Sequence, residues 1–205
     1  TLMATFTPGN EAIRKESSKL VVPRIGVRFR LPAEMEQVTY FGRGPEENYC
    51  DRNNGTLVGE YQATAEQMYF PYVRPQENGH HTDTRWLMLK KKNGKGLAVY
   101  ADGTLEFNSL RNSIEDFDGE EAVQRDYQWN NRDAEELKHD VSTAKNIKPR
   151  QTHINDITPR DFVEVCLDMR QMGVGGFDSW GAVPDPQYLI PANKEYQWGF
   201  TIVPM

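Results

Sequence analysis

The residues best suited to contact a ligand lie in a glycine-rich segment near the C-terminus, residues 172–181 (MGVGGFDSWG). Glycine allows positive φ and lets the backbone approach another surface closely. The indole of Trp180 offers a flat apolar face and one N–H donor, which together suit a sugar ring. The segment therefore predicts either an exposed binding loop or a tight hairpin whose Trp180 folds back into the core. A dinucleotide-binding motif is excluded, because Pro184 and Pro186 follow in place of a helix.

A second segment, residues 69–86, combines aromatic, amide, acidic and histidine side chains. Metal ligation by His80, His81 and Asp83 is one interpretation of this segment. However, neighbouring residues of a strand point to opposite faces, and the spacing matches no strong metal motif. The alternative is a buried turn in which the side chains of residues 76–78 satisfy backbone groups. We therefore predict no metal ligand in the chain.

Residues 42–52 (GRGPEENYCDR) form a loop by their glycines and proline, yet they carry two arginines and three acids. Pairing of Arg43 or Arg52 with Asp51 or Glu47 would rigidify such a turn through charge-assisted hydrogen bonds. Direct contact of these side chains with a ligand is the alternative. We favour internal pairing as the role of this loop.

Other catalytic signatures are missing from the sequence. It contains no G-x-S-x-G elbow, no H-E-x-x-H motif and no Walker loop. His139, in an expected helix at 132–141, and His153 are more typical of surface or packed histidines than of catalytic bases. Carboxylates are plentiful, but a glycosidase pair is defined by a separation that the sequence does not give. Residue types and spacing alone therefore lead only to a β domain with a Trp-bearing loop.

The segments that must position these residues are short and alternate between apolar and polar side chains, as antiparallel strands do. Asn93-Gly94 is a favoured hairpin turn between two apolar runs. No β-α-β rhythm separates the strands, which favours one antiparallel sandwich over two domains. Strands are expected at residues 24–31, 38–41, 57–61, 85–90, 96–101, 105–109, 162–168 and 196–202.

Composition limits the partners. The net charge is -6 and basic residues are interspersed with acids, which argues against nucleic acid or an anionic membrane as partner. The one dense basic run, residues 90–95, falls at the expected hairpin turn, so we interpret it as a solvated loop tip. No stretch approaches the ~20 apolar residues of a membrane span. Cys50 and Cys166 lie too far apart for a C-x-x-C site and leave both a cytoplasmic and a periplasmic location open.

The chain begins at Thr1 without an initiator methionine, and we interpret it as part of a longer protein. Residues 1–19 are expected to be a lead-in segment. The acidic stretch 112–128 lacks periodicity and is interpreted as an exposed insertion. One domain is expected over 1–205.

Three motifs carry a resemblance to a known family: residues 42–52, residues 68–79 (MYFPYVRPQENG) and residues 172–180. In this order they resemble the C-terminal, small-chain-like domain (domain 5) of bacterial β-galactosidases of glycoside hydrolase family 2. Residues 23–26 (PRIG) match as well. The resemblance covers about 20–205, and three long motifs in order rarely arise by chance.

The resemblance implies a galactose mutarotase-like antiparallel β-supersandwich, truncated at its N-terminus. It also implies retaining hydrolysis of terminal β-D-galactosides by two glutamates that belong to a separate barrel domain. This chain alone is therefore expected to be inactive and to hold no cofactor, with Mg and Na ions in other domains of the parent enzyme. Expected partners are β-galactoside sugars, the remaining domains or a large subunit, and further copies of the enzyme.

The site implied by the resemblance is Trp180, which would reach the barrel's active site as a platform for the aglycone, with Asp178 bracing its loop. Phe177 departs from the family pattern, in which a polar residue is common.

Two other functions remain open. One is an aldose-epimerase-like enzyme acting alone, with acid and base drawn from His80, His81, His153 and Glu77. The other is a structural or oligomerisation module without sugar contact.

Overall fold

The computed structural model describes residues 1–7, 21–118, 153–178 and 181–205 of the chain. By its contacts the chain divides into two compact units. The larger unit comprises Thr1–Phe70, Asn78–Arg111 and Arg160–Met205, and the smaller comprises Pro71–Glu77 and Asn112–Pro159. The expected helix at 132–141, with His139, lies outside the described residues.

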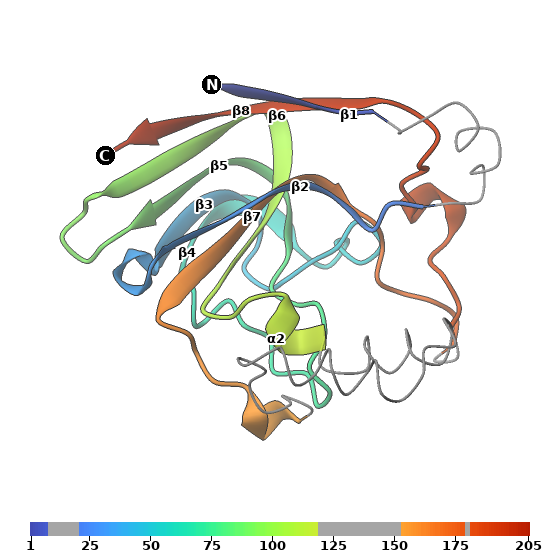
Figure 1. Cartoon of the computed structure of the whole chain (residues 1–205), viewed down its shortest axis with the longest axis horizontal. Helices are drawn as coiled ribbons and strands as arrows, with labels where there is room; N and C mark the ends of the chain where they lie inside the picture. Colours follow the sequence, from blue (N-terminus) through green and yellow to red (C-terminus); the bar gives the residue numbers. More distant parts are fainter. Residues whose placement is uncertain (8–20, 119–152, 179–180) are drawn as a thin grey trace, which may run out of the picture. The chain divides into compact units, whose positions relative to one another are not determined.

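The described residues of the larger unit form a sheet of eight antiparallel strands (Figure 1). The order of its main path is β1-β8-β6-β5-β3-β4, and β7 joins it by pairing with both β6 and β2. This arrangement confirms the mainly β, antiparallel fold class. The strands are β1 (Leu2–Phe6), β2 (Arg24–Pro32), β3 (Gln37–Gly44), β4 (Leu57–Thr64), β5 (His81–Lys90), β6 (Gly96–Leu110), β7 (Phe162–Gln171) and β8 (Tyr196–Pro204).

The long strand β6 links the two parts of the sheet. Residues 97–101 pair with β8, whereas residues 106–110 pair with β7. The two strands predicted at 96–101 and 105–109 are therefore one, and this prediction of a break was wrong. Gly103 lies between the two halves with φ 89. Glycine tolerates this conformation, so the strand continues through Gly103.

The first strand, β1, was not expected, because residues 1–19 were interpreted as a lead-in. It pairs with β8 from Leu2 opposite Phe200 to Phe6 opposite Tyr196, and Figure 1 shows it running along β8. Leu2, Met3 and Ala4 are consecutive apolar residues, so the segment lacks the alternation by which the other strands are recognised.

The hairpin predicted at Asn93-Gly94 is confirmed between β5 and β6. The Lys91 N–H donates to the Lys95 carbonyl at 2.8 Å, and the Gly94 N–H donates to the Lys91 carbonyl at 2.9 Å. Gly94 has φ 85, which is the left-handed conformation that such turns require.

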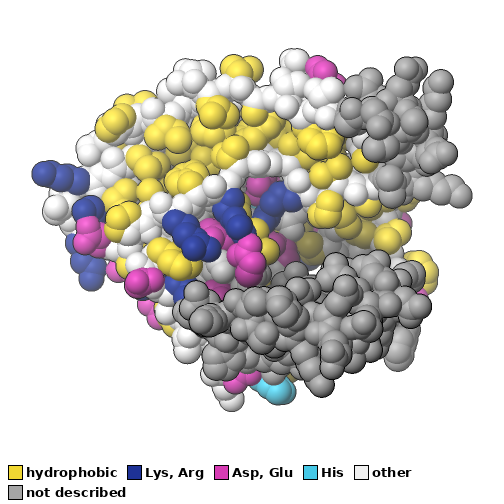
Figure 2. Space-filling model, in the orientation of Figure 1, with side chains coloured by type: hydrophobic (Ala, Val, Ile, Leu, Met, Phe, Trp, Pro, Cys, Tyr) yellow, Lys and Arg dark blue, Asp and Glu magenta, His cyan; other side chains and the backbone are white. Residues whose placement is uncertain are grey.

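The core of the sheet is formed by side chains that alternate along the central strands. Their solvent exposure is 2% or less for Val38, Leu87, Leu89, Val99, Phe107, Val165 and Leu167. Hydrophobic side chains also form part of the surface, as Figure 2 shows over the region of β1 and β8. Exposed side chains on these two strands include Leu2, Met3, Ile202 and Val203.

The smaller unit is described only in part. It contains the short helix α2 (Glu115–Asp118) and a 3₁₀ helix at Ile154–Asp156. The Asn112 side-chain amide donates to the Thr158 carbonyl at 2.8 Å, and the Ser113 N–H donates to Asp116 Oδ2 at 3.0 Å. None of the helices in the described ranges is long and apolar enough to cross a membrane.

Candidate functional site

The glycine-rich loop, residues 172–181, leaves the end of β7 and is tied to three other segments. The Met172 N–H donates to the Pro23 carbonyl and the Gly173 N–H to the Tyr188 carbonyl, each at 2.9 Å. The Gly175 N–H donates to Asp51 Oδ2 at 2.7 Å. The first half of the loop is therefore fixed by main-chain hydrogen bonds and by one carboxylate.

The close approach of the Asp51 carboxylate explains why residues 173 and 175 of this loop are glycines. A Cβ on Gly173 would lie 2.6 Å from Asp51 Oδ2, and one on Gly175 would lie 3.0 Å from it. Neither glycine has a positive φ, whereas Gly181 has φ 111. The expected conformational freedom therefore applies to Gly181, and close approach of the carboxylate accounts for the other two.

The predicted contact residues lie in the second half of this loop. Asp178 is exposed, and its Oδ1 accepts a hydrogen bond from the Ala182 N–H at 3.3 Å. Trp180 lies outside the described residues. Phe177 is 92% exposed, so the loop carries at least one large hydrophobic side chain into solvent.

A polar network holds the root of the loop. The Gln171 N–H donates to Glu106 Oε2 at 2.6 Å, and the Arg24 guanidinium donates to Gln171 Oε1 and, at 2.6 Å, to Asn108 Oδ1. Arg24 Nε also lies 3.1 Å from Asp168 Oδ2, and the Asp168 side chain is 1% exposed. Removing one member of such a buried charge pair leaves the other charge uncompensated and lowers the stability of the fold.

His80 belongs to the same network and is fully buried. Its Nε2 lies 3.0 Å from Glu106 Oε2 and its Nδ1 lies 2.7 Å from Asn108 Oδ1, while its ring stacks on Tyr49 at 5.2 Å. Burial lowers the pKa of His80, but the hydrogen bond and charge of Glu106 outweigh burial, so the pKa is raised above its ordinary value. His80 thus favours the charged form.

His81 lies in different surroundings. Its ring contacts Tyr40 and Phe107, with centroids 4.9 and 5.2 Å away, and its nitrogens lie near the carbonyls of Gly79 and Pro45. Burial lowers the pKa of His81 to about 4. The two neighbouring histidines therefore have separate partners and do not form a common site.

The 42–52 loop is held in part by internal pairing, as predicted. Arg52 pairs with Glu47, whose other oxygen accepts the Gly79 N–H at 2.6 Å. Arg43 instead pairs with Asp83 at 2.5 Å, because β3 and β5 are neighbours in the sheet. Asp51 is directed to Gly175 of the glycine-rich loop.

Asn48 joins the 42–52 loop to the start of β5. Its side-chain oxygen accepts both the backbone N–H and the hydroxyl of Thr82, at 3.0 and 2.6 Å, and its amide donates to the Arg43 and Glu46 carbonyls. Asn78 likewise accepts the Phe70 N–H at 3.2 Å. The buried-turn interpretation of residues 76–78 is confirmed for Asn78.

Metal ligation would need side chains that converge. Among the described residues, no group of three or more His, Cys, Asp or Glu is arranged to hold a metal ion. Asp83 pairs with Arg43. His80 instead contacts Glu106 and Asn108, and His81 contacts the carbonyls of Gly79 and Pro45. Neither Cys50 nor Cys166 forms a disulfide with a described residue, and the Cys50 thiol donates to the Gln171 carbonyl at 3.4 Å.

Sequence reasoning missed Arg24, Glu106, Asp168 and Gln171 as the residues that hold the loop root. They are distributed over β2, β6 and β7, and no spacing in the sequence connects them. The one available signal was a polar residue within an otherwise apolar strand, such as Asp168 in VEVCLDM.

The fold and the loop define the class of the protein as an antiparallel β domain that carries an anchored, glycine-rich surface loop. Residues 3–202 match the model of the family described as "Beta galactosidase small chain". The chain belongs to this family. The match begins before residue 20, where the resemblance was expected to start.

Several proteins named β-galactosidase are similar in sequence to this chain. The one from Priestia megaterium is 31% identical over 187 residues, and the one from Streptococcus thermophilus is 31% identical over 184 residues. A third, from Vibrio cholerae, is 30% identical over 181 residues. These alignments cover 90%, 89% and 88% of this chain but only 15%, 15% and 14% of the relatives. The chain thus spans about a seventh of the length of these proteins.

Proposed function

We propose that this chain is an accessory domain of a β-galactosidase of glycoside hydrolase family 2, which hydrolyses terminal β-D-galactosides with retention of configuration. The two catalytic glutamates would belong to a barrel domain outside this sequence, along with any Mg or Na ions. Membership of the small-chain family carries this proposal, together with relatives of which the chain covers 15%. The partners would be the remaining domains of the enzyme, or a large subunit, and further copies of it.

The role of the domain would be to supply Trp180 to the aglycone side of the substrate site. The anchoring of the loop supports this role, because Asp51 and the Gln171 network hold the segment that leads to it. Asp178 would brace the loop through the hydrogen bond that its carboxylate accepts from the Ala182 N–H. A rigid support reduces the entropy lost when an aromatic platform binds a sugar.

Trp180→Ala in the full-length enzyme tests this role. We expect the KM for lactose to rise about tenfold with little change in kcat, because stacking contributes about 1–3 kcal/mol and lies away from the reacting bond. Trp180→Phe is the matched control and should retain most of the affinity. An unchanged KM for lactose in the alanine variant refutes the role of Trp180.

The chain alone should not hydrolyse nitrophenyl β-galactoside, since the proposed glutamates are elsewhere. Robust hydrolysis by the purified 205-residue chain would contradict this. The epimerase alternative requires an accessible acid and base; of its four candidates, His80 and His81 are buried with internal partners, whereas His153 is exposed. Polarimetry with galactose separates the two functions, and we expect no mutarotation above the buffer rate.

A further inference from the structure

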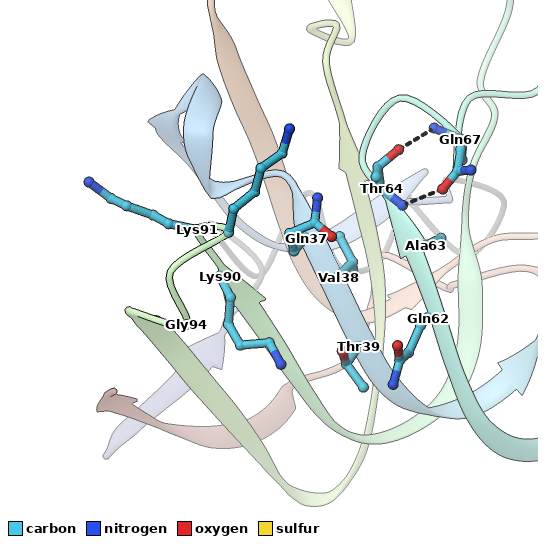
Figure 3. Close-up of a pocket in the computed structure, with 11 residues that line it drawn as sticks. Gln37, Val38, Thr39, Gln62, Ala63, Thr64, Gln67, Lys90, Lys91 and Gly94 are labelled. Carbon is cyan, nitrogen blue, oxygen red and sulfur yellow. Dashed lines mark hydrogen bonds between the residues drawn. The ribbon is translucent and has the colours of Figure 1, made fainter.

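A polar groove of about 420 Å³ lies over three neighbouring strands, β4, β3 and β5, and reaches the hairpin turn after β5. Figure 3 shows side chains from all three strands around it. Those that carry the chemistry are Gln37, Thr39, Gln62, Gln67, Lys90 and Lys92. None of its lining residues belongs to the glycine-rich loop.

Strand register places four of these side chains on one face of the sheet. Gln37 lies opposite Lys90 of β5, and Thr39 lies opposite Gln62 of β4. Directly opposed residues of antiparallel strands share a face, as do residues two apart along one strand. Val38, between Gln37 and Thr39, is 1% exposed and packs on the other face. The groove floor is therefore a continuous patch of amides, a hydroxyl and an ammonium group.

The polar groups of this floor are available to a ligand. The side chains of Gln37, Thr39 and Gln62 make no hydrogen bond to any described residue. At one end, the Thr64 N–H donates to Gln67 Oε1 at 2.9 Å and the Gln67 N–H donates to Thr64 Oγ1 at 3.2 Å (Figure 3). This reciprocal pair fixes Gln67 beside the groove, with its side-chain NH₂ left as a donor.

The charge of the groove is positive. Lys90, Lys91 and Lys92 line it, and no acid is among its lining residues, although the chain as a whole carries a net charge of -6. Lys91 is neutralised by Glu34. Lys90 and Lys92 have no ion pair with the described acids, so two ammonium groups remain for an anion.

We propose that this groove binds a small oxyanion-bearing polyol, a molecule with several hydroxyls and one carboxylate or phosphate group. Lys90 and Lys92 would neutralise the oxyanion, which an ammonium binds as a point charge. The Gln37 and Gln62 amides both donate and accept, which suits hydroxyls. The groove volume lies in the ~300–1,000 Å³ range of small-molecule sites and accommodates one such molecule. The basic run thus becomes part of a site instead of only a solvated loop tip.

Calorimetric titration of the purified chain with four probes tests the groove. Gluconate and glucose 6-phosphate carry both groups, inorganic phosphate carries only the charge, and glucose carries only hydroxyls. We expect the two anionic polyols to bind at least about tenfold more tightly than phosphate or glucose, and less tightly as salt increases. Binding of phosphate or glucose as tight as that of the anionic polyols, or no binding of either polyol, overturns the proposal.

Charge variants locate the binding. Lys90→Gln combined with Lys92→Gln should weaken gluconate binding about tenfold and remove its salt dependence. Lys90→Gln alone is compared with Lys95→Gln as the matched control, because each removes one charge from the same hairpin and Lys95 does not line the groove. Equal weakening by Lys95→Gln would show that only the general charge of the hairpin attracts the ligand. Urea midpoints equal to that of the unmodified chain confirm that the variants are folded.

Discussion

Polar side chains are used in opposite ways at the root of the glycine-rich loop and in the groove over β3, β4 and β5. At the loop root, Arg24, Glu106 and Gln171 bond to one another or to other buried side chains. In the groove, Gln37 and Gln62 make no side-chain hydrogen bond with the described residues. Both regions are rich in charged and amide side chains, yet of the two only the groove leaves such side chains available to bind a ligand.

This difference separates support from recognition. A buried polar group must find an internal partner, so a satisfied network fixes the backbone that it touches. A half-exposed group can exchange water for a ligand at little cost to the fold. Variants at the loop root should therefore reduce stability, whereas variants in the groove should change binding alone.

The largest effect is expected from Asp168→Ala. Removing this carboxylate leaves the Arg24 guanidinium without its 3.1 Å counter-charge and should lower the free energy of unfolding by about 3 kcal/mol, measured by urea denaturation. The double variant Arg24→Met with Asp168→Ala should lose less than the sum of the single variants, because no charge then remains unpaired. Additive losses would contradict the pairing.

A loss of stability of similar size is expected when the pH is lowered, because of His81. Its pKa falls to about 4 in the folded chain from an ordinary 6.5. The unfolded chain therefore binds a proton that the folded chain refuses, and stability present above pH 6.5 is lost as pH falls towards 4. The loss is about 3 kcal/mol for this one group. Urea titrations at several pH values measure it, and His81→Asn should flatten the slope in this window.

His80 should act in the opposite direction. Its pKa is raised in the folded chain, so its stabilisation is fully present below pH 6.5 and is lost as pH rises through the folded value. If His80→Gln and His81→Asn change the pH profile in the same direction, the two histidines do not differ in surroundings as described.

A smaller loss of stability is expected when an added side chain at residue 173 prevents Asp51 from approaching the glycine-rich loop. Gly173→Ala places a Cβ 2.6 Å from the Asp51 carboxylate and should cost about 1–3 kcal/mol of unfolding free energy. Exchange of the Gly175 amide hydrogen should accelerate as its bond to Asp51 weakens. Gly55→Ala is the control, since a Cβ at that site meets nothing within 4 Å. Equal losses of unfolding free energy in Gly173→Ala and Gly55→Ala would contradict the close packing of Asp51 on Gly173.

The smallest effect on stability is expected in the groove. Gln62→Ala removes an exposed side chain that has no hydrogen bond to the described residues, so the unfolding free energy should change by less than about 0.5 kcal/mol. The same variant should weaken gluconate binding measured by calorimetry. A stability loss like that of Asp168→Ala would remove the distinction between the two regions.

Local signals in the sequence predicted much of the fold. Alternation identified every strand except β1, and Asn93-Gly94 identified the β5–β6 hairpin. The false break in β6 came from Gly103, because a glycine in a strand and a glycine in a turn have the same sequence signal.

The partners of the site residues could not be predicted in the same way. The 42–52 loop was expected to pair within itself, but Asp51 bonds to Gly175, 124 residues away. Such a pairing depends on which strands lie side by side, and this order is set by the whole sheet. Residue types identified the glycine-rich loop and the resemblance gave Trp180 its expected role, whereas the residues that hold the loop became evident only from the structure.

The central claim is that the anchored loop exists to present Trp180 to the substrate, and a double-mutant cycle tests it most directly. The KM for lactose is measured in the full-length enzyme for Asp51→Ala, Trp180→Ala and both changes together. We predict that Asp51→Ala raises KM when Trp180 is present and has no further effect when it is absent, because Asp51 acts through the loop. Independent, multiplicative effects of the two changes on KM would contradict the claim.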